Sequence, residues 1–152
     1  MLGLFVTPAV TAIGDALARA AAALPSSAVG AAIAVVGNAK LAAALGAGRE
    51  VIPVGLSLRA AKKLRGAARE LAALEAGSVV AVVGVDLAIA AGWEDLLRDW
   101  SRVVRDGGAI VVVDRGHAHE ASRRALCGGL TEIEQRRAGR SVITSGLVSH
   151  FG

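Results

Sequence analysis

Apolar residues along this chain alternate between short continuous runs and segments in which they recur every three or four positions. A short continuous run is typical of a strand buried on both faces, and the second spacing is typical of an amphipathic helix. Strands and helices in strict alternation predict right-handed crossovers and a parallel sheet. The predicted order is strand 31–36, helix 39–46, strand 50–54, helix 58–73, strand 79–85, helix 93–105, strand 109–114 and helix 118–127.

The helix predicted from Trp93 has the clearest period, because its apolar residues share one stripe and its charged residues lie opposite them. Trp93 and Trp100 both lie on this stripe, so we expect them to pack against the sheet rather than to stack on a ligand. Gly107 and Gly108 are expected to end the helix.

Both ends of the chain depart from the alternation. Thr7 and Pro8 predict the start of a first helix, as a cap followed by a first-turn proline, and Pro25 predicts its end. Near the other end, two strand-like stretches are separated by the turn at 138–140, which predicts an antiparallel hairpin. The predicted sheet is therefore parallel first and mixed at one end.

The composition fits one domain, residues 1–152, made of an N-terminal helix and linker (1–28) and an α/β core (29–152). Of the 152 residues, 54% are apolar and 20% are charged, which is enough to bury a core and excludes disorder. The N-terminus has no positively charged region, so a signal peptide is not expected. The uncharged run at residues 20–39 is interrupted by Pro25 and the two serines after it, so a membrane span is not expected either. With one cysteine, Cys127, no internal disulfide can form, and the cytoplasm is the expected location.

The net charge of +4 permits an acidic partner. Basic residues gather in the predicted helix 58–73 and in the pairs Arg123-Arg124 and Arg136-Arg137. No aromatic residues are interleaved with them for base stacking, so solvated helix faces are the favoured interpretation. Binding of nucleic acid or another polyanion is kept as the weaker alternative.

The second half of the chain contains the stretch "VVAVVGVDLAIAAGWEDLLRDWSRVVRDGGAIVVVDRG", residues 79–116. This stretch resembles the fourth strand, the following loop and helix, and the fifth strand of the class I S-adenosylmethionine-dependent methyltransferases, in particular of their small type 11 branch. Residues 102–108 match the signature R-V-L-R-P-G-G, with Asp106 in place of the proline. Residues 128–147 are similar to the closing hairpin, with Gly129-Leu130 where the family has G-F.

This resemblance covers about 120 residues and implies a Rossmann-like three-layer α/β/α fold. The sheet would be mostly parallel, with about six strands and a C-terminal antiparallel hairpin. It also implies S-adenosylmethionine as the cofactor wherever the site still functions.

The first half departs from the family pattern. The family has an acidic residue on its first strand and a loop of the form E/D-x-G-x-G-x-G, whereas "AIAVVGNAKLAAAL" places Ala34 near the acid and keeps one glycine, Gly37. The second family strand ends V-D-L-S, and its carboxylate holds both ribose hydroxyls. Gly55 stands at that position here.

The segment between Ser57 and Ser78 is short for the helix, third strand and loop that the family has there. One helix fills these residues, so we expect the third strand to be missing. Pro53 leads independently to the same arrangement, because a proline inside a strand is tolerated at the edge of a sheet but not in its middle. The strand 50–54 is therefore expected at an edge.

Ligands in open α/β sheets bind at the carboxyl ends of the strands. The candidates for the degenerate cofactor edge are Gly37, Asn38, Gly55 and Asp86. Asp86 is also the candidate catalytic residue, and capping of the loop before the Trp93 helix is its structural alternative.

Further candidates follow the next strand. Asp114, His117 and His119 lie within "DRGHAHE", which contains enough ligands for a metal ion, although we expect only a helix-starting loop there. Cys127 is expected to be a buried core thiol, since no base partner is identifiable. His150, near the end of the sequence, is left out of the site.

Loss of the glycines, the ribose acid and the third strand, with the core pattern kept, predicts a methyltransferase-like domain that has lost cofactor binding. Such a domain would act as a non-catalytic subunit, scaffold or regulatory partner, bound to another protein or to itself. The alternative is an active methyltransferase with an atypical cofactor loop, so whether the chain is an enzyme stays open. No other catalytic motif is present.

Overall fold

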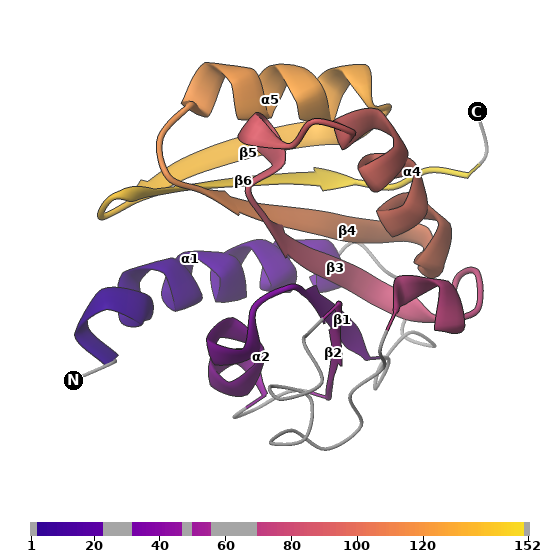
Figure 1. Ribbon diagram of the computed structural model, residues 1–152, viewed down its shortest axis with the longest axis horizontal. Helices are drawn as coiled ribbons and strands as arrows, with labels where there is room; N and C mark the ends of the chain where they lie inside the picture. Colours follow the sequence, from indigo (N-terminus) through magenta and orange to yellow (C-terminus); the bar gives the residue numbers. More distant parts are fainter. Residues whose placement is uncertain (1–2, 23–31, 47–49, 56–69, 151–152) are drawn as a thin grey trace.

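A six-stranded sheet with helices on both faces forms the centre of the molecule (Figure 1). The structure is a computed structural model, and it describes residues 3–22, 32–46, 50–55 and 70–150. The strands are β1 (Ile33–Val36), β2 (Val51–Val54), β3 (Val79–Val85), β4 (Val104–Asp114), β5 (Thr131–Ala138) and β6 (Ser141–Leu147). The helices are α1 (Gly3–Ala22), α2 (Ala39–Leu45), α4 (Trp93–Val103) and α5 (Ala118–Cys127), with short 3₁₀ helices η2 (Leu71–Ala73) and η3 (Leu87–Ile89).

The strand order is β2-β1-β3-β4-β6-β5. The first four strands are parallel, while β6 is antiparallel to both β4 and β5. This arrangement confirms the predicted α/β/α fold with a C-terminal antiparallel hairpin.

Alternation of side chains along the central strands creates two apolar cores. Ile33 and Val35 of β1 pack with α1 and α2 on one face, whereas Ala34 belongs to the core under α4 and α5. In β4, Val111 lies in the first core and Ile110 in the second. Because both faces of these strands are buried, their sequences are continuous apolar runs.

Trp100 is the largest side chain buried beneath α4, with 2% of its surface exposed. It lies against Gly84 of β3, where an added Cβ atom would come within 2.4 Å of the indole. The predicted packing of this tryptophan against the sheet is therefore confirmed, and it requires a residue without a side chain at position 84.

Helix α1 begins earlier than predicted. It extends from Gly3 to Ala22 and contains Pro8, so the prediction that Thr7 caps this helix was wrong. A proline in the second turn removes one backbone hydrogen bond, and the helix keeps its remaining bonds and its packing against the sheet. No helix in the described part of the chain combines the length and the apolar character needed to cross a membrane.

The junction of α4 and β4 also differs from the prediction. The helix ends at Val103, and β4 begins at Val104 instead of 109, so Gly107 and Gly108 lie within the strand. Val104 already pairs with Val79, and the register shifts after that pair. Pairing with β3 thus takes these residues into the sheet, and an added Cβ at Gly108 would meet the carbonyl oxygen of Val80 at 2.4 Å.

β2 lies at one edge of the sheet in the described part of the chain, as Pro53 predicted. Most of the predicted helix 58–73 lies outside the described residues, and its last part forms the 3₁₀ helix η2. Residues 70–78 contain no strand. The absence of a third family strand stays a prediction, because residues 56–69 are outside the description.

Substitution of Gly84 by alanine tests the contact with Trp100. We expect Gly84→Ala to lower the free energy of unfolding by about 1–3 kcal/mol, because the new methyl group overlaps the indole. Urea unfolding monitored by tryptophan fluorescence measures the loss. Gly92→Ala is the control, since Gly92 has a negative φ and nothing lies within 4 Å of its added Cβ. Equal stability of the two variants would contradict this packing.

Candidate functional site

The carboxyl ends of the parallel strands bring most of the candidate residues to one edge of the sheet. β1 and β3 are neighbours, with Val35 opposite Val83, so Gly37 and Asp86 leave the sheet from the same edge. β4 lies beside β3, with Val113 opposite Val85, which adds Asp114 to this edge. The edge has two halves, one after β1 and β2 and one after β3 and β4.

The half after β1 and β2 is a tight turn with few free polar groups. The N–H of Gly37 donates to the carbonyl of Val54 at 2.7 Å, which joins the ends of the two strands. Asn38 caps α2, since its Oδ1 accepts a hydrogen bond from the N–H of Leu41 at 2.9 Å. Gly37 and Gly55 both have positive φ, at 73° and 69°. The candidate amide of Asn38 therefore already has a structural role.

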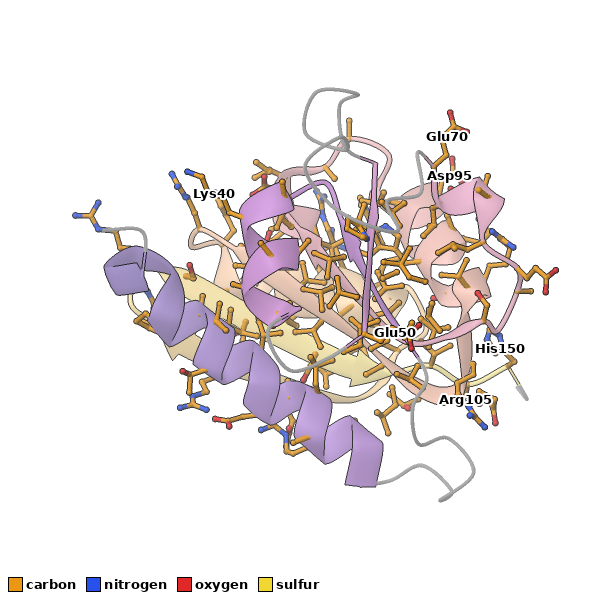
Figure 2. All side chains as sticks on the ribbon, turned by 90° about the horizontal axis from the view of Figure 1, so that it is seen from below. Lys40, Glu50, Glu70, Asp95, Arg105 and His150 are labelled. Atoms are coloured by element: carbon orange, nitrogen blue, oxygen red, sulfur yellow. The ribbon has the colours of Figure 1, made fainter. Side chains whose placement is uncertain are left out.

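The space beside this turn is open among the described residues. An added Cβ at Gly37 would meet nothing within 4 Å. Lys40 is exposed, and Figure 2 shows it projecting outward beside the start of α2.

Asp114 is the most unusual polar residue of the second half. It lies at the end of β4 with 2% of its surface exposed, and its Oδ1 accepts a hydrogen bond from the N–H of Ala88 at 2.9 Å. Its Oδ2 is buried and has no partner among the described residues. Burial raises the pKa of this carboxyl, the charge of Asp86 adds to that rise, and the Ala88 bond opposes it.

Two residues in left-handed backbone conformations flank Asp114. Asp86 has a φ of 59° and His117 a φ of 55°, which L-residues rarely adopt. Asp86 precedes η3 and His117 precedes α5, but neither side chain makes a capping hydrogen bond. The expected capping alternative for Asp86 is therefore wrong. The N–H of Asp86 donates to the carbonyl of Val113 at 2.9 Å, and His117 follows Asp114 by three residues, so the structure brings these three candidates together.

His119 does not join them. It is exposed on the first turn of α5 and makes no hydrogen bond or ion pair within the described residues. In that part of the chain, no three His, Cys, Asp or Glu side chains are grouped so that they could hold a metal ion.

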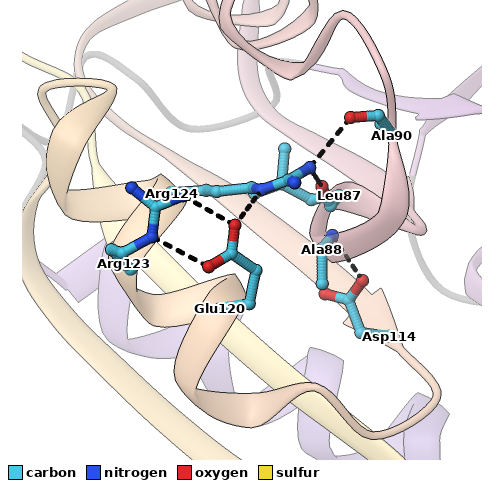
Figure 3. A network of polar contacts seen from close by, with 7 residues as sticks. All are labelled: Leu87, Ala88, Ala90, Asp114, Glu120, Arg123 and Arg124. Atoms are coloured by element: carbon cyan, nitrogen blue, oxygen red, sulfur yellow. Dashed lines mark hydrogen bonds and ion pairs between the residues drawn. The ribbon is translucent and has the colours of Figure 1, made fainter.

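Arg124 holds the loop after β3 in place, a role that the sequence did not reveal (Figure 3). Its Nη1 donates to the carbonyls of Leu87 and Ala90, at 2.9 and 2.8 Å. Its Nε donates to Glu120 at 2.6 Å. Together with the Asp114–Ala88 bond, these contacts fix residues 86–90 against α5 and β4. The only signal in the sequence is the helical spacing of Glu120 and the Arg123-Arg124 pair.

Glu120 and Trp93 complete this network. Arg123 binds both carboxylate oxygens of Glu120, at 2.8 and 2.7 Å. These bonds, followed by the Arg124 bond, lower the pKa of Glu120 to about 2. The guanidinium of Arg124 also lies 5.4 Å from the ring centre of Trp93. Trp93 thus packs on arginine as well as on the core beneath α4.

Cys127 is exposed, so the expectation of a buried core thiol was wrong. The buried face of α5 carries Ala121 and Ala125. Position 127 lies two residues beyond Ala125, about 200° around the helix, and so faces away from the core.

The residues present do not fit the ribose end of S-adenosylmethionine. Between Asp15 and Glu70 the chain has one carboxylate side chain, Glu50. Glu50 directly precedes β2, at the amino end of the strand, and Figure 2 shows it well away from Lys40. Gly55, at the carboxyl end, offers no side chain. No residue from 16 to 69 can therefore supply at this edge the acid that the family uses to hold the ribose hydroxyls.

No protein-family model and no curated protein matches this chain. Solved structures with the same fold do exist. One is the complex between the Haloferax volcanii Trm112 methyltransferase activator and a methyltransferase, in which the matched chain is 13% identical, with a TM-score of 0.66 over 89% of this chain and 90% of that one. A SAM-dependent methyltransferase from Thermotoga maritima is 15% identical, with a TM-score of 0.62 over 88% and 87%.

A third structure is PigF with SAH, which is 16% identical and has a TM-score of 0.67. This chain aligns over 96% of its own length and spans 56% of PigF. At these identities the similarity shows the fold.

Removal of the Arg124 side chain should loosen the loop after β3. We expect Arg124→Ala to lower the free energy of unfolding by about 1–3 kcal/mol, since two backbone carbonyls lose their donor. Amide hydrogen exchange at Ala88 and Ala90 should accelerate. Arg123→Ala is the matched control, because Arg123 binds the same glutamate but no carbonyl of the loop. A loop that exchanges equally fast in both variants would show that Arg124 does not hold it.

Asp114→Asn tests the raised pKa. Because the folded state keeps the proton on this carboxyl above its usual pKa of 3.8, the contribution of Asp114 to stability falls as the pH rises through that window. We therefore expect the stability of the variant, relative to the parent, to increase as the pH rises above the usual pKa of 3.8. Urea unfolding at a series of pH values measures this difference. The exposed Asp99→Asn is the control, and the same trend there would contradict the assignment.

Proposed function

We propose that this chain, which has the fold of the S-adenosylmethionine-dependent methyltransferases, is a non-catalytic domain that no longer binds the cofactor. The observation that carries the proposal is the missing carboxylate at the ends of β1 and β2. Glu50 is the only acid from residue 16 to residue 69, and it lies at the opposite end of β2. A hydrogen-bonding site that loses its charged acceptor leaves the ligand's hydroxyls without partners, which weakens binding strongly.

The turn after β1 supports the same conclusion. The N–H of Gly37 and the Oδ1 of Asn38 are both occupied within the protein, by Val54 and by the first turn of α2. The remaining core is intact, with both faces of β1, β3 and β4 buried. A site that is lost while the core is kept is the pattern expected when the fold is retained for another purpose.

We propose that this purpose is association with a protein partner or with a second copy of the chain, as a subunit, scaffold or regulatory partner. One protein of the same fold was solved in a complex with a methyltransferase activator, so the fold is compatible with such assembly. In the present chain β2 lies at an edge of the described sheet. Pro53 has no N–H to donate there, so direct strand pairing through β2 is disfavoured.

The alternative is a working methyltransferase, and one group of residues favours it. Asp86 and His117 keep left-handed conformations beside the buried carboxyl of Asp114, and such backbone strain gathers at functional sites. Under this alternative the exposed Asp86 would accept a hydrogen bond from the methyl acceptor and orient it.

Calorimetric titration of the purified chain separates the two functions. We expect no saturable heat with S-adenosylmethionine or S-adenosylhomocysteine at concentrations up to about 1 mM, because the ribose end lacks its acid. Binding of either compound at micromolar concentration would contradict loss of the cofactor site. In that case Asp86→Asn should reduce methyl transfer by a larger factor than it weakens cofactor binding. Light scattering after size exclusion measures self-association in the same sample.

A further inference from the structure

A second concave surface lies away from the candidate site, along α4 and beside the amino ends of β3 and β4. It encloses about 790 Å³, and its charged lining residues are Glu94, Arg98, Arg102, Arg105 and Asp106. His150 and the exposed thiol of Cys127 also line it. We call this surface the arginine groove. Figure 2 shows Arg105 and His150 close together and far from Lys40, which marks the opposite edge.

The arginines of the groove have unused hydrogen-bond donors. Arg102 donates through Nη2 to the carbonyls of Leu71 and Leu74, at 3.3 and 2.9 Å, which holds the guanidinium in place. Its Nε and Nη1 have no partner among the described residues. Arg105 makes no hydrogen bond or ion pair within that part of the chain. Arg98 pairs with Asp95 through Nη1 alone.

Part of the acceptor capacity of the groove is already used within the protein. Asp106 accepts the N–H of His150 at 2.8 Å. The Nε2 of His150 lies 2.7 Å from the carbonyl of Val104, and an N–H must be at this position because a carbonyl can only accept. Glu94 is the other carboxylate that lines the groove. Donors therefore outnumber the free acceptors.

We infer that the arginine groove binds a small molecule that carries phosphate groups. A planar guanidinium with free N–H groups matches the oxygens of phosphate in a two-bond arrangement, and a fixed guanidinium loses little freedom on binding. The volume lies within the range of small-molecule pockets. Glu94 and Asp106 also line the groove and limit its net positive charge, which suits a compact anion better than a long polyanion. The groove is separate from the cofactor edge, so this inference does not depend on loss of the cofactor.

Binding of inorganic pyrophosphate and of inorganic phosphate to the full chain tests the inference. We expect saturable binding by calorimetry, with pyrophosphate the tighter ligand. Arg105→Ala should weaken pyrophosphate binding about ten-fold or more, since a charge-assisted hydrogen bond is lost. The pyrophosphate affinity of Arg105→Lys should lie between those of the parent and of Arg105→Ala, because lysine keeps the charge but not the planar guanidinium. Arg105 has no described partner in the fold, so these variants are expected to fold, and circular dichroism checks this.

Arg137→Ala is the matched control. Arg137 is exposed on β5, and its substitution changes the net charge equally without touching the groove. Pyrophosphate affinity should stay within about two-fold of the parent, since a remote exposed charge is largely screened. Absence of saturable binding, or equal weakening by Arg105→Ala and Arg137→Ala, would overturn the inference.

Two further measurements distinguish phosphate binding in the arginine groove from nucleic-acid binding and from cofactor binding. If a single-stranded RNA binds more tightly than pyrophosphate, and if this binding weakens steeply with salt, the arginine groove is a nucleic-acid site and the inference of a small phosphate ligand is overturned. Repetition in the presence of about 1 mM S-adenosylmethionine should leave pyrophosphate affinity unchanged. The cofactor titration and the pyrophosphate titration can therefore fail independently of each other.

Discussion

Burial of the central strands on both faces is the constraint on which the rest of this structure depends. β1, β3 and β4 lie between α1 and α2 on one side and α4 and α5 on the other, so they have no solvent face along most of their length. Polar side chains can therefore stand only at the ends of these strands, where the chain turns. The same constraint sets local detail, since Trp100 fits beneath α4 only because Gly84 has no side chain.

The carboxyl edge of the sheet shows how differently its two halves are built. After β1, a short turn is closed by the hydrogen bonds of Gly37 and Asn38, and residues 37–49 and 51–69 contain no acid. After β3 and β4, a buried carboxyl and an arginine hold a loop through the Ala88 N–H and the carbonyls of Leu87 and Ala90. Turn residues contribute little to the core, so half of such an edge can change while the fold persists.

The arginine groove forms where α4 brings the chain back to the amino edge of the sheet. α4 runs back from the carboxyl edge to the amino edge, and its polar face carries Arg98 and Arg102 at a spacing of four residues. β4 begins directly after α4, which places Arg105 in the groove. His150 comes from the segment after β6, and its backbone N–H donates to Asp106. Residues from three separate segments thus meet at an edge where parallel sheets do not usually bind ligands.

The spacing and type of residues along the chain are enough to predict the alternation of strands and helices, the closing hairpin and the edge position of the strand that contains Pro53. They also show that Glu50 is the one acid between residues 16 and 69. These features follow from periodicity and residue type, which show the kind of each element and which of its faces is apolar. The burial of Asp114 with one oxygen unpartnered among the described residues, the role of Arg124 in holding the loop, and the exposure of Cys127 become visible in the folded chain alone. Such features depend on how segments far apart in the sequence meet, and the spacing of residues along the chain carries no record of those contacts.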